Sequence, residues 1–119
     1  MNGLIIKPFW LERILYHRKR IEIRGSSTKK VNEPIYLIES KGKVVATAVI
    51  SRVIELDEIL WENLMPLHQV EIPYLSLKDR YKTPYGWVLE DVEPIEPFDY
   101  EKHQGAVIWV KDVKEERHL

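Results

Sequence analysis

Cysteine is absent from this chain of 119 residues, which excludes a disulfide framework, a thiolate zinc site and a cysteine nucleophile. Long hydrophobic runs are absent as well. Apolar stretches such as residues 44–50 fall far short of the roughly 20 residues of a membrane-spanning helix, and no basic and then apolar leader opens the sequence. We therefore expect no membrane association and a cytoplasmic location.

Histidine and glycine are both scarce. The four histidines, at positions 17, 68, 103 and 118, lie far apart and form neither an H-x-x-x-H nor an H-E-x-x-H pattern. The five glycines form no phosphate-binding loop, and no G-x-S-x-G motif occurs. The sequence thus predicts neither a metal site nor a cofactor.

What is present is typical of a soluble globular protein, with 45% hydrophobic and 31% charged residues. The length suits one domain with one sizeable core, and no repeat, low-complexity tract or linker divides the chain. We expect a single domain over residues 1–119.

Charge is unevenly distributed, although the formal net charge is only −1. Residues 1–30 hold eight Lys or Arg and two Glu, whereas the other 89 residues hold ten basic and seventeen acidic side chains. The first segment thus carries +6 and the rest −7. This asymmetry favours a locally positive surface that attracts anions such as phosphate. The alternative is that Arg18, Lys19 and Arg20 only solvate a helix end and interact with its dipole.

Hydrophobic spacing predicts an α+β protein. Alternation and β-branched residues indicate strands at 3–7, 20–24, 34–39, 44–53, 85–92 and 106–113, and helical spacing indicates helices at 8–17, 56–68 and 76–81. Gly42 is expected in a hairpin turn, Pro66 at a helix break, and Pro94 and Pro97 in a connection between strands. Five or six strands with two or three helices favour a small, mostly antiparallel β-barrel that hides its strand edges.

The segment from residue 17 to residue 24 carries the most informative motif. It reads His17-Arg-Lys19-Arg-Ile-Glu22-Ile-Arg24, and it follows an apolar strand ending in Lys7 and a helix. This arrangement resembles the ASCH domain, a PUA-like family of small β-barrels whose motif is G-x-K-x-x-E-x-R. The stretches 43–49, 85–92 and 105–109 agree with the resemblance, which therefore covers nearly the whole chain.

One position departs from the family pattern, because His17 stands where the family has glycine. If that position needs a positive φ, histidine is strained there and glycine is not. Alternatively, the helix runs one residue further.

The resemblance implies an RNA-associated role and a cleft, between barrel and helices, that accepts a nucleotide. Lys19 and Arg24 can donate to a phosphate or a base edge, and Glu22 can accept from an exocyclic amine or hold the two cations. The candidate binding residues are Lys7, Lys19, Glu22, Arg24, Ser26, Ser27, Thr28, Lys29 and Lys30, with RNA or a nucleotide as the partner. Trp10, Tyr85 or Trp87 can offer a stacking face, although Trp10 and Trp87 also suit the core.

The two-residue period of a strand makes a geometric prediction for this motif. Ile21 and Ile23 should be buried, while Glu22 and Arg24 should line a cleft under the first helix. The alternative for Arg20 and Glu22 is an ion pair on a solvated face with no function.

Enzymatic activity is the alternative function, since some ASCH relatives are hydrolases. In an N4-acetylcytidine amidohydrolase branch, the motif lysine and a threonine three residues later are catalytic, with a distant glutamate. Here Lys19 keeps the first position and Glu22 replaces the threonine. These two are the candidate catalytic residues, with Glu22 as a base toward water and Lys19 polarising a carbonyl. Candidates for the distant acid are Glu55, Asp57, Glu58 and Glu62. For a ribonuclease branch, Tyr16 and Ser27 merely lie near the motif.

A nucleotide- or RNA-binding module therefore ranks first and a small RNA or nucleoside hydrolase second. A non-catalytic interaction domain ranks third, and it is favoured if the motif is solvated and the cleft filled. If the protein is a hydrolase, Lys19→Ala should abolish turnover with little change in melting temperature, because a cleft-lining lysine contributes little to the core. The sequence predicts neither the oligomeric state nor the RNA target.

Overall fold

The computed structural model describes residues 1–102, 104–105 and 108–116, and every structural statement below concerns these residues. They form six strands and four helices: β1 (Gly3–Ile6), α1 (Pro8–Tyr16), β2 (Ile21–Arg24), β3 (Pro34–Glu39), β4 (Val44–Glu55), α2 (Glu58–Asn63), α3 (Met65–His68), α4 (Tyr74–Arg80), β5 (Tyr85–Phe98) and β6 (Trp109–Val110). None of these helices has the length and apolar character that crossing a membrane requires.

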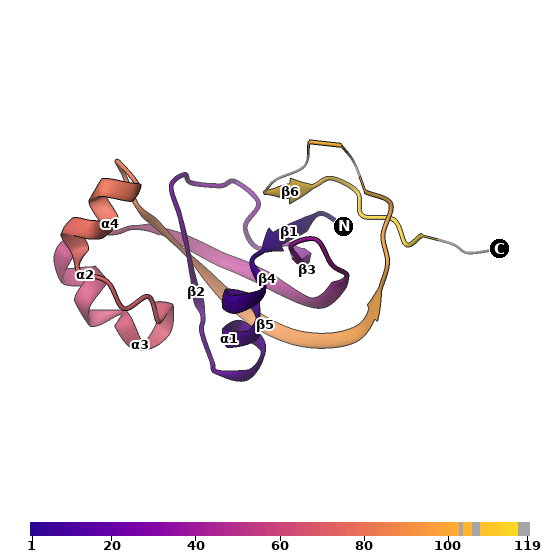
Figure 1. Cartoon of the computed structure of the whole chain (residues 1–119), viewed down its shortest axis with the longest axis horizontal. Coiled ribbons are helices and arrows are strands. Elements are labelled where there is room, and N and C mark those ends of the chain that lie inside the picture. Colours follow the sequence, from indigo (N-terminus) through magenta and orange to yellow (C-terminus); the bar gives the residue numbers. More distant parts are fainter. Residues whose placement is uncertain (103, 106–107, 117–119) are drawn as a thin grey trace.

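The strands form one curled sheet in the order β2-β5-β4-β3-β1-β6 (Figure 1). Among the described strands only β1 and β3 pair in parallel, so the sheet is mostly antiparallel. Three register shifts interrupt the β4–β5 ladder, and such bulges bend strands and increase their twist. The predicted α+β, mostly antiparallel and barrel-like fold is confirmed, with four helices in place of two or three.

Helix α1 follows the predicted pattern, with Pro8 in its first turn and Leu11 and Ile14 buried against the sheet. The helix ends at Tyr16, and His17 has a φ of −126°. The neighbouring Arg18 adopts the left-handed conformation, with a φ of 59°. His17 therefore needs no positive φ and is not strained, the helix does not run one residue further, and the chain reverses at Arg18.

Helices α2, α3 and α4 form a lobe at one end of the molecule (Figure 1). The predicted helix over residues 56–68 is divided, because Pro66 lies in the first turn of α3 and lacks the N–H group that continuation requires. Asp57 caps α2 by accepting a 2.8 Å hydrogen bond from the Leu60 N–H. Helix α4 begins at Tyr74 after Pro73, two residues earlier than predicted.

Strand β5 is longer than predicted, since it continues through Pro94 and Pro97 to Phe98. Its pairing with β2 ends at Val88, so the remainder of β5 has one unpaired edge where proline is tolerated. The expectation that these prolines lie in a connection between strands is wrong. The final predicted strand, 106–113, is shorter: residues 106 and 107 lie outside the described residues, and β6 spans Trp109–Val110.

Gly42 lies in the turn of the hairpin between β3 and β4, as predicted, and the positive φ of this turn, 64°, is at Lys41. Gly42 instead packs closely against Glu39, where an added Cβ would lie 3.1 Å from the Glu39 Cβ. Glycine is thus favoured at position 42 by the close approach of that side chain.

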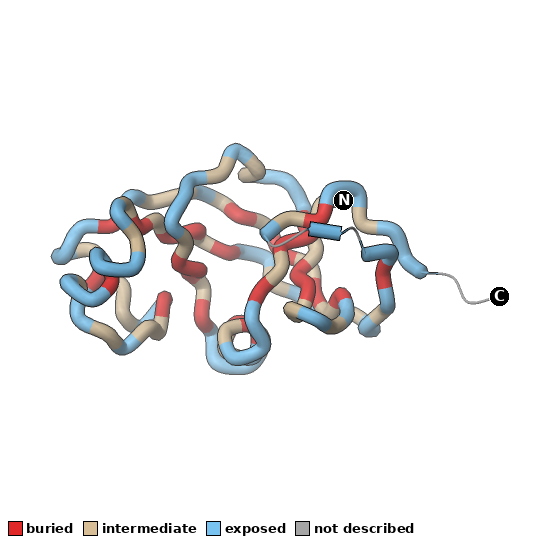
Figure 2. The backbone as a smooth tube through the Cα atoms, turned by 45° about the horizontal axis from the view of Figure 1, so that its top comes forward, coloured by how far each residue is buried: buried red, intermediate tan, exposed pale blue. Residues whose placement is uncertain are grey.

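The buried hydrophobic residues form three clusters, and buried segments are spread along the length of the molecule (Figure 2). The largest lies between α1 and the sheet, and a smaller one holds residues of β3, β4 and β6 with Tyr100. The remaining cluster joins Ile21 and Ile23 of β2, an edge strand of the sheet, to Leu56 and to Trp61 and Leu77 of the helical lobe. This arrangement leaves space beside β2 for a cavity.

Candidate nucleotide-binding cavity

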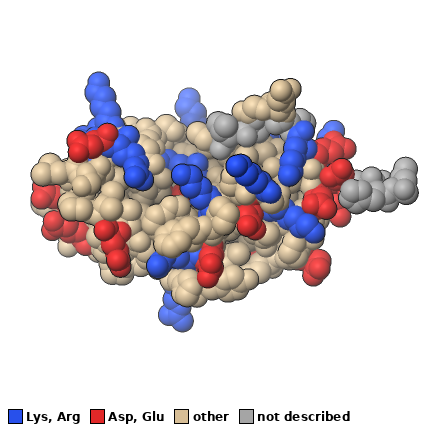
Figure 3. Space-filling model, in the orientation of Figure 1, with Lys and Arg blue, Asp and Glu red and all other residues tan. Residues whose placement is uncertain are grey.

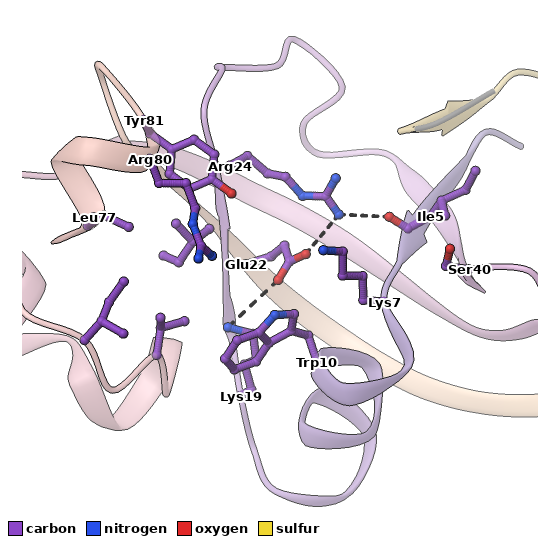
Figure 4. A pocket seen from close by; sticks show the side chains of 13 residues that line it. Ile5, Lys7, Trp10, Lys19, Glu22, Arg24, Ser40, Leu77, Arg80 and Tyr81 are labelled. Carbon is purple, nitrogen blue, oxygen red and sulfur yellow. Dashed lines mark hydrogen bonds and ion pairs between the residues drawn. The ribbon is translucent and has the colours of Figure 1, made fainter. Parts of the chain in front are cut away.

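A cavity of about 230 Å³ lies beside β2, between the start of α1 and the helical lobe (Figure 4). Its charged lining consists of four cations and one carboxylate, from Lys7, Lys19, Arg24, Arg80 and Glu22. The remaining lining residues are Ile5, Trp10, Ile23, Ser40, Val70, Ile72, Leu77 and Tyr81. The cavity therefore combines a polar floor with apolar and aromatic walls.

Lys19 enters the interior because the chain reverses at Arg18. The Lys19 N–H returns to the Arg13 carbonyl at 3.1 Å, and the Arg20 guanidinium donates to the Ile14 carbonyl at 2.7 Å. Arg20 thus caps the end of α1, and it does not form the solvated ion pair with Glu22 that was the alternative interpretation. These contacts fix the backbone from which the Lys19 side chain extends.

The Lys19 side chain is fully buried, with 0% of its surface exposed. Its Nζ donates to the Ile21 carbonyl at 2.7 Å and to the His68 carbonyl, and lies 3.9 Å from Glu22 Oε1. The Trp10 ring covers Nζ, with its centroid 4.8 Å away. Burial lowers the pKa of Lys19 from 10.5 to about 8, against the opposing attraction of Glu22.

Glu22 is held from two sides. Its Oε2 accepts a 2.9 Å hydrogen bond from Arg24 Nη2, which also donates to the Ile5 carbonyl at 2.9 Å, and its Oε1 faces Lys19. Glu22 is 5% exposed. Lys19, Glu22 and Arg24 thus form an ion triad. Because Lys19 exposes no surface, a ligand in the cavity can touch the Glu22 carboxylate and the Arg24 guanidinium but not the Lys19 ammonium.

His68, whose carbonyl accepts a hydrogen bond from Lys19 Nζ, is itself held by several contacts. Its ring stacks on Trp61 at 3.8 Å, Nε2 lies 2.7 Å from the Trp61 carbonyl, and Nδ1 accepts from the Val70 N–H at 3.0 Å. One nitrogen therefore donates and the other accepts, as in a neutral imidazole. Burial, the largest cause, lowers the pKa of His68, so the ring stays neutral beside the Lys19 cation.

The predicted geometry of the motif is confirmed. Ile21 and Ile23 are buried, and Glu22 and Arg24 line the cavity beside Lys19, although Ile23 also borders the cavity. Lys7, one of the predicted binding residues, lines the cavity as well.

The loop after β2 does not join the cavity, although it was grouped with the motif as a binding segment. Ser26, Ser27, Thr28, Lys29 and Lys30 are absent from the cavity lining. The Ser26 carbonyl accepts from Trp87 Nε1 at 2.9 Å, and Thr28 Oγ1 accepts from the Lys30 N–H at 3.1 Å. Lys30 Nζ lies over the Trp109 ring at 5.0 Å. These contacts order the loop away from the cavity.

Of the three proposed stacking residues, only Trp10 lines the cavity. Trp87 is 1% exposed and belongs to the main core, and its ring lies 5.6 Å from the Arg24 guanidinium and 5.9 Å from the Trp109 ring. Tyr85 packs against the main core. The core interpretation is therefore correct for Trp87, whereas Trp10 both packs against the main core and lines the cavity.

Sequence reasoning missed the contribution of the helical lobe. Val70, Ile72, Leu77, Arg80 and Tyr81 all line the cavity, and no local pattern marks them because they reach it only through tertiary packing. None of the candidates for a distant acid, Glu55, Asp57, Glu58 and Glu62, lines it. Tyr16 and Ser27, which lie near the motif in sequence, are both exposed and outside the lining.

Burial of Lys19 also corrects an energetic expectation. The prediction that Lys19→Ala leaves the melting temperature unchanged assumed an accessible side chain, but the side chain is fully buried and satisfies two backbone carbonyls. Its removal leaves those carbonyls without a donor, which is destabilising.

Within the described residues, no group of three or more His, Asp or Glu side chains could hold a metal ion.

Comparison with known proteins supports the fold. The structure is similar to that of ASCH from Zymomonas mobilis, with a TM-score of 0.66 and 16% identity over 82% of this chain and 72% of that chain. A Tyr-to-Phe variant of that protein gives a TM-score of 0.65, also at 16% identity, covering 82% of this chain and 74% of that chain. This chain has the fold of ASCH domain structures. No protein-family model and no curated protein matches the sequence.

Proposed function

We propose that this ASCH-fold protein binds one nucleotide unit, free or within RNA, in the cavity beside β2. The observation that carries the proposal is a buried carboxylate, Glu22, held by two cations at the floor of a cavity with an aromatic wall. A carboxylate accepts hydrogen bonds from the exocyclic amine of a nucleobase. Trp10 and Tyr81 supply aromatic surface against which a base can pack.

The charge of the cavity favours the phosphate of such a ligand. Lys7 and Arg80 line the cavity, are exposed, and extend toward it from opposite sides of Glu22 (Figure 4). Figure 3 shows Lys and Arg side chains in the middle of one face, with Asp and Glu side chains concentrated toward the two ends. A locally positive surface of this kind attracts phosphate despite a net charge of −1.

The size of the cavity limits what it can enclose. Pockets for drug-sized molecules measure roughly 300 to 1,000 Å³, and this cavity measures about 230 Å³. It therefore suits a single base or nucleoside and not a folded or double-stranded RNA. A solvated motif and a filled cleft would favour the alternative of an interaction domain, whereas Lys19 and Glu22 are buried beside an open cavity.

Isothermal titration calorimetry with the four nucleoside 5′-monophosphates at low salt tests the proposal. We expect binding of the cytidine, adenosine and guanosine compounds, and weaker binding of the uridine compound, because uracil lacks an exocyclic amine for Glu22. Equal affinity for all four would remove Glu22 from base recognition. Absence of binding by all four, and by a short single-stranded RNA, would refute the proposed function.

A pair of variants on one helix sharpens this test. Arg80→Gln removes a charge from the cavity lining, whereas Lys78→Gln removes a charge from an exposed α4 side chain outside it. We expect Arg80→Gln to weaken nucleotide binding and Lys78→Gln to leave it unchanged. Equal affinities of the two variants would contradict a phosphate contact at Arg80.

Hydrolysis is the second candidate, and the pairing of Lys19 with Glu22 supports it. An amine with a pKa of about 8 and a carboxylate 3.9 Å away can act together as acid and base near neutral pH. Lys19 exposes no surface and Trp10 covers it, so this activity requires Trp10 to move. Mass spectrometry of N4-acetylcytidine incubated with the protein tests it: conversion to cytidine and acetate, lost in Lys19→Met, supports hydrolysis, and unchanged substrate refutes it for this compound.

A further inference from the structure

The cavity has more positive charge than its own carboxylate can balance. Four cationic side chains line it, and Glu22 is the one carboxylate among the described lining residues, which leaves an excess of three positive charges. Lys19 and Arg24 contact Glu22 directly. The charges of Lys7 and Arg80 are therefore left for a ligand.

Several donors around the cavity are also unused. Neither the Lys7 nor the Arg80 side chain forms a hydrogen bond or an ion pair in the part of the chain that the structure describes. Arg24 uses Nη2 for both Glu22 and the Ile5 carbonyl, so Nη1 and Nε remain available on a guanidinium that those contacts hold in place. A fixed guanidinium with free N–H groups suits the oxygens of a phosphate.

The charge on a phosphate depends on its esterification. A phosphate monoester carries about −1.5 to −2 at neutral pH and has three strong acceptor oxygens, whereas each internal phosphodiester of a nucleic acid carries a single negative charge. An excess of three positive charges in a small, partly enclosed space is better matched by the monoester.

On this basis, and resting on the proposed nucleotide site, we propose that the cavity selects a terminal phosphate monoester over an internal phosphodiester. Lys7, Arg80 and the free N–H groups of Arg24 contact the phosphate, while Glu22 faces the base. The shared ligand chemistry is a nucleoside phosphate monoester, which occurs both in a free mononucleotide and at a phosphorylated RNA end.

Cytidine 5′-monophosphate and its phosphate methyl ester form a matched pair of ligands for calorimetry. They share base, sugar and phosphorus, and they differ by about one negative charge and one acceptor oxygen. We expect the methyl ester to bind roughly tenfold more weakly, as the loss of one charge-assisted hydrogen bond predicts. Equal affinity for the two would overturn the selection while leaving the nucleotide site intact. Absence of binding by both, and by cytidine, would instead refute the site itself.

Short RNA distinguishes the two sources of the ligand. A 5′-phosphorylated tetranucleotide that binds at least as tightly as the mononucleotide, and about tenfold more tightly than the same RNA without the phosphate, indicates recognition of an RNA end. Binding by the mononucleotide but not by the phosphorylated tetranucleotide indicates a free nucleotide. Equal binding of the two RNAs would contradict selection of a terminal phosphate.

The double variant Lys7→Gln, Arg80→Gln tests whether the preference for the phosphate monoester depends on the cavity. We expect it to bind the monophosphate and its methyl ester with nearly equal affinity, because the excess of positive charge in the cavity falls from three to one. The matched control, Lys29→Gln, Lys78→Gln, removes the same charge from exposed positions outside the lining and should keep the preference. A preference that survives the Lys7 and Arg80 changes would place the phosphate elsewhere.

Discussion

Two adjacent segments of the chain show how differently basic residues can be used. Residues 19–24 and residues 25–30 are both rich in cations and were grouped together by sequence. In the first, Lys19 and Arg24 are held against Glu22 and backbone carbonyls at the floor of a cavity. In the second, Lys29 is exposed and Lys30 lies over Trp109, both outside the cavity.

The difference lies in desolvation. A charge removed from water requires an opposite charge and hydrogen bonds, and those partners fix its position. A charge in a surface loop keeps its water and interacts weakly with its neighbours. A group that the fold holds in place is suited to recognise a particular ligand, whereas a solvated charge outside the cavity adds only long-range attraction.

The largest contrast between the two segments should appear in stability. Glu22→Ala leaves Lys19 buried without its counter-charge, and breaking a buried pair costs about 3–5 kcal/mol. Lys29→Ala, at an exposed position, should change the free energy of unfolding by less than about 0.5 kcal/mol. Urea denaturation measures both, and similar values for the two variants would show that the triad is not electrostatically coupled.

The next largest difference between the two segments should appear in how the free energy of unfolding depends on pH. Lys19 has a pKa of about 8 in the folded protein and 10.5 ordinarily, so the unfolded chain binds more protons between these values. Below pH 8 the buried Lys19 side chain is charged, and its full desolvation penalty destabilises the folded protein. This penalty decreases as the pH rises, because the amine loses its proton. Relative to Lys19→Met, the wild-type protein should gain up to about 1.4 kcal/mol of stability per pH unit in this range.

Denaturation curves at several pH values between 7 and 10.5 test this expectation. Lys29→Met is the matched control, since its side chain is exposed and should give a difference from wild type that does not vary with pH. A flat difference for Lys19→Met as well would mean that its ammonium is not desolvated.

Two tryptophans offer a comparison of aromatic roles. Trp10 lines the cavity, whereas Trp109 lies between Trp87 and Lys30 and presents no stacking face to it. Loss of a base–aromatic stack costs roughly 1–3 kcal/mol, so Trp10→Leu should weaken nucleotide binding about 5- to 160-fold. Trp109→Leu should leave the affinity of the folded protein unchanged, and the reverse ranking in calorimetry would move the site to the loop.

The smallest effect should come from the loop itself. Lys29→Ala, Lys30→Ala should change mononucleotide affinity by less than about twofold, because these side chains lie outside the cavity and exposed charges are screened by salt. For a longer single-stranded RNA the same variant should weaken binding modestly and reduce its salt dependence, as the loss of phosphate contacts predicts. Binding measured at two or more salt concentrations provides the comparison.

Much of the fold was predictable, because its elements follow local rules. The alternation in residues 20–24 placed Ile21 and Ile23 in the core and Glu22 and Arg24 beside the cavity. Pro66 marked the division between α2 and α3. The errors fell where local signals gave way to sheet context, as at Pro94 and Pro97, which are tolerated in β5 because its neighbour β2 is short.

The sequence by itself determined the strands, the first helix and the charged motif, since periodicity and residue chemistry act within a few residues of one another. Only the tertiary structure decided which cations of residues 1–30 share a cavity and that Lys19 is fully buried. It also decided that Arg80 and Tyr81 line the same cavity. The helical lobe meets β2 across more than 45 residues of sequence, as in the bond from Lys19 to the His68 carbonyl. Burial and charge pairing depend on such long-range packing, and no local pattern in the chain encodes them.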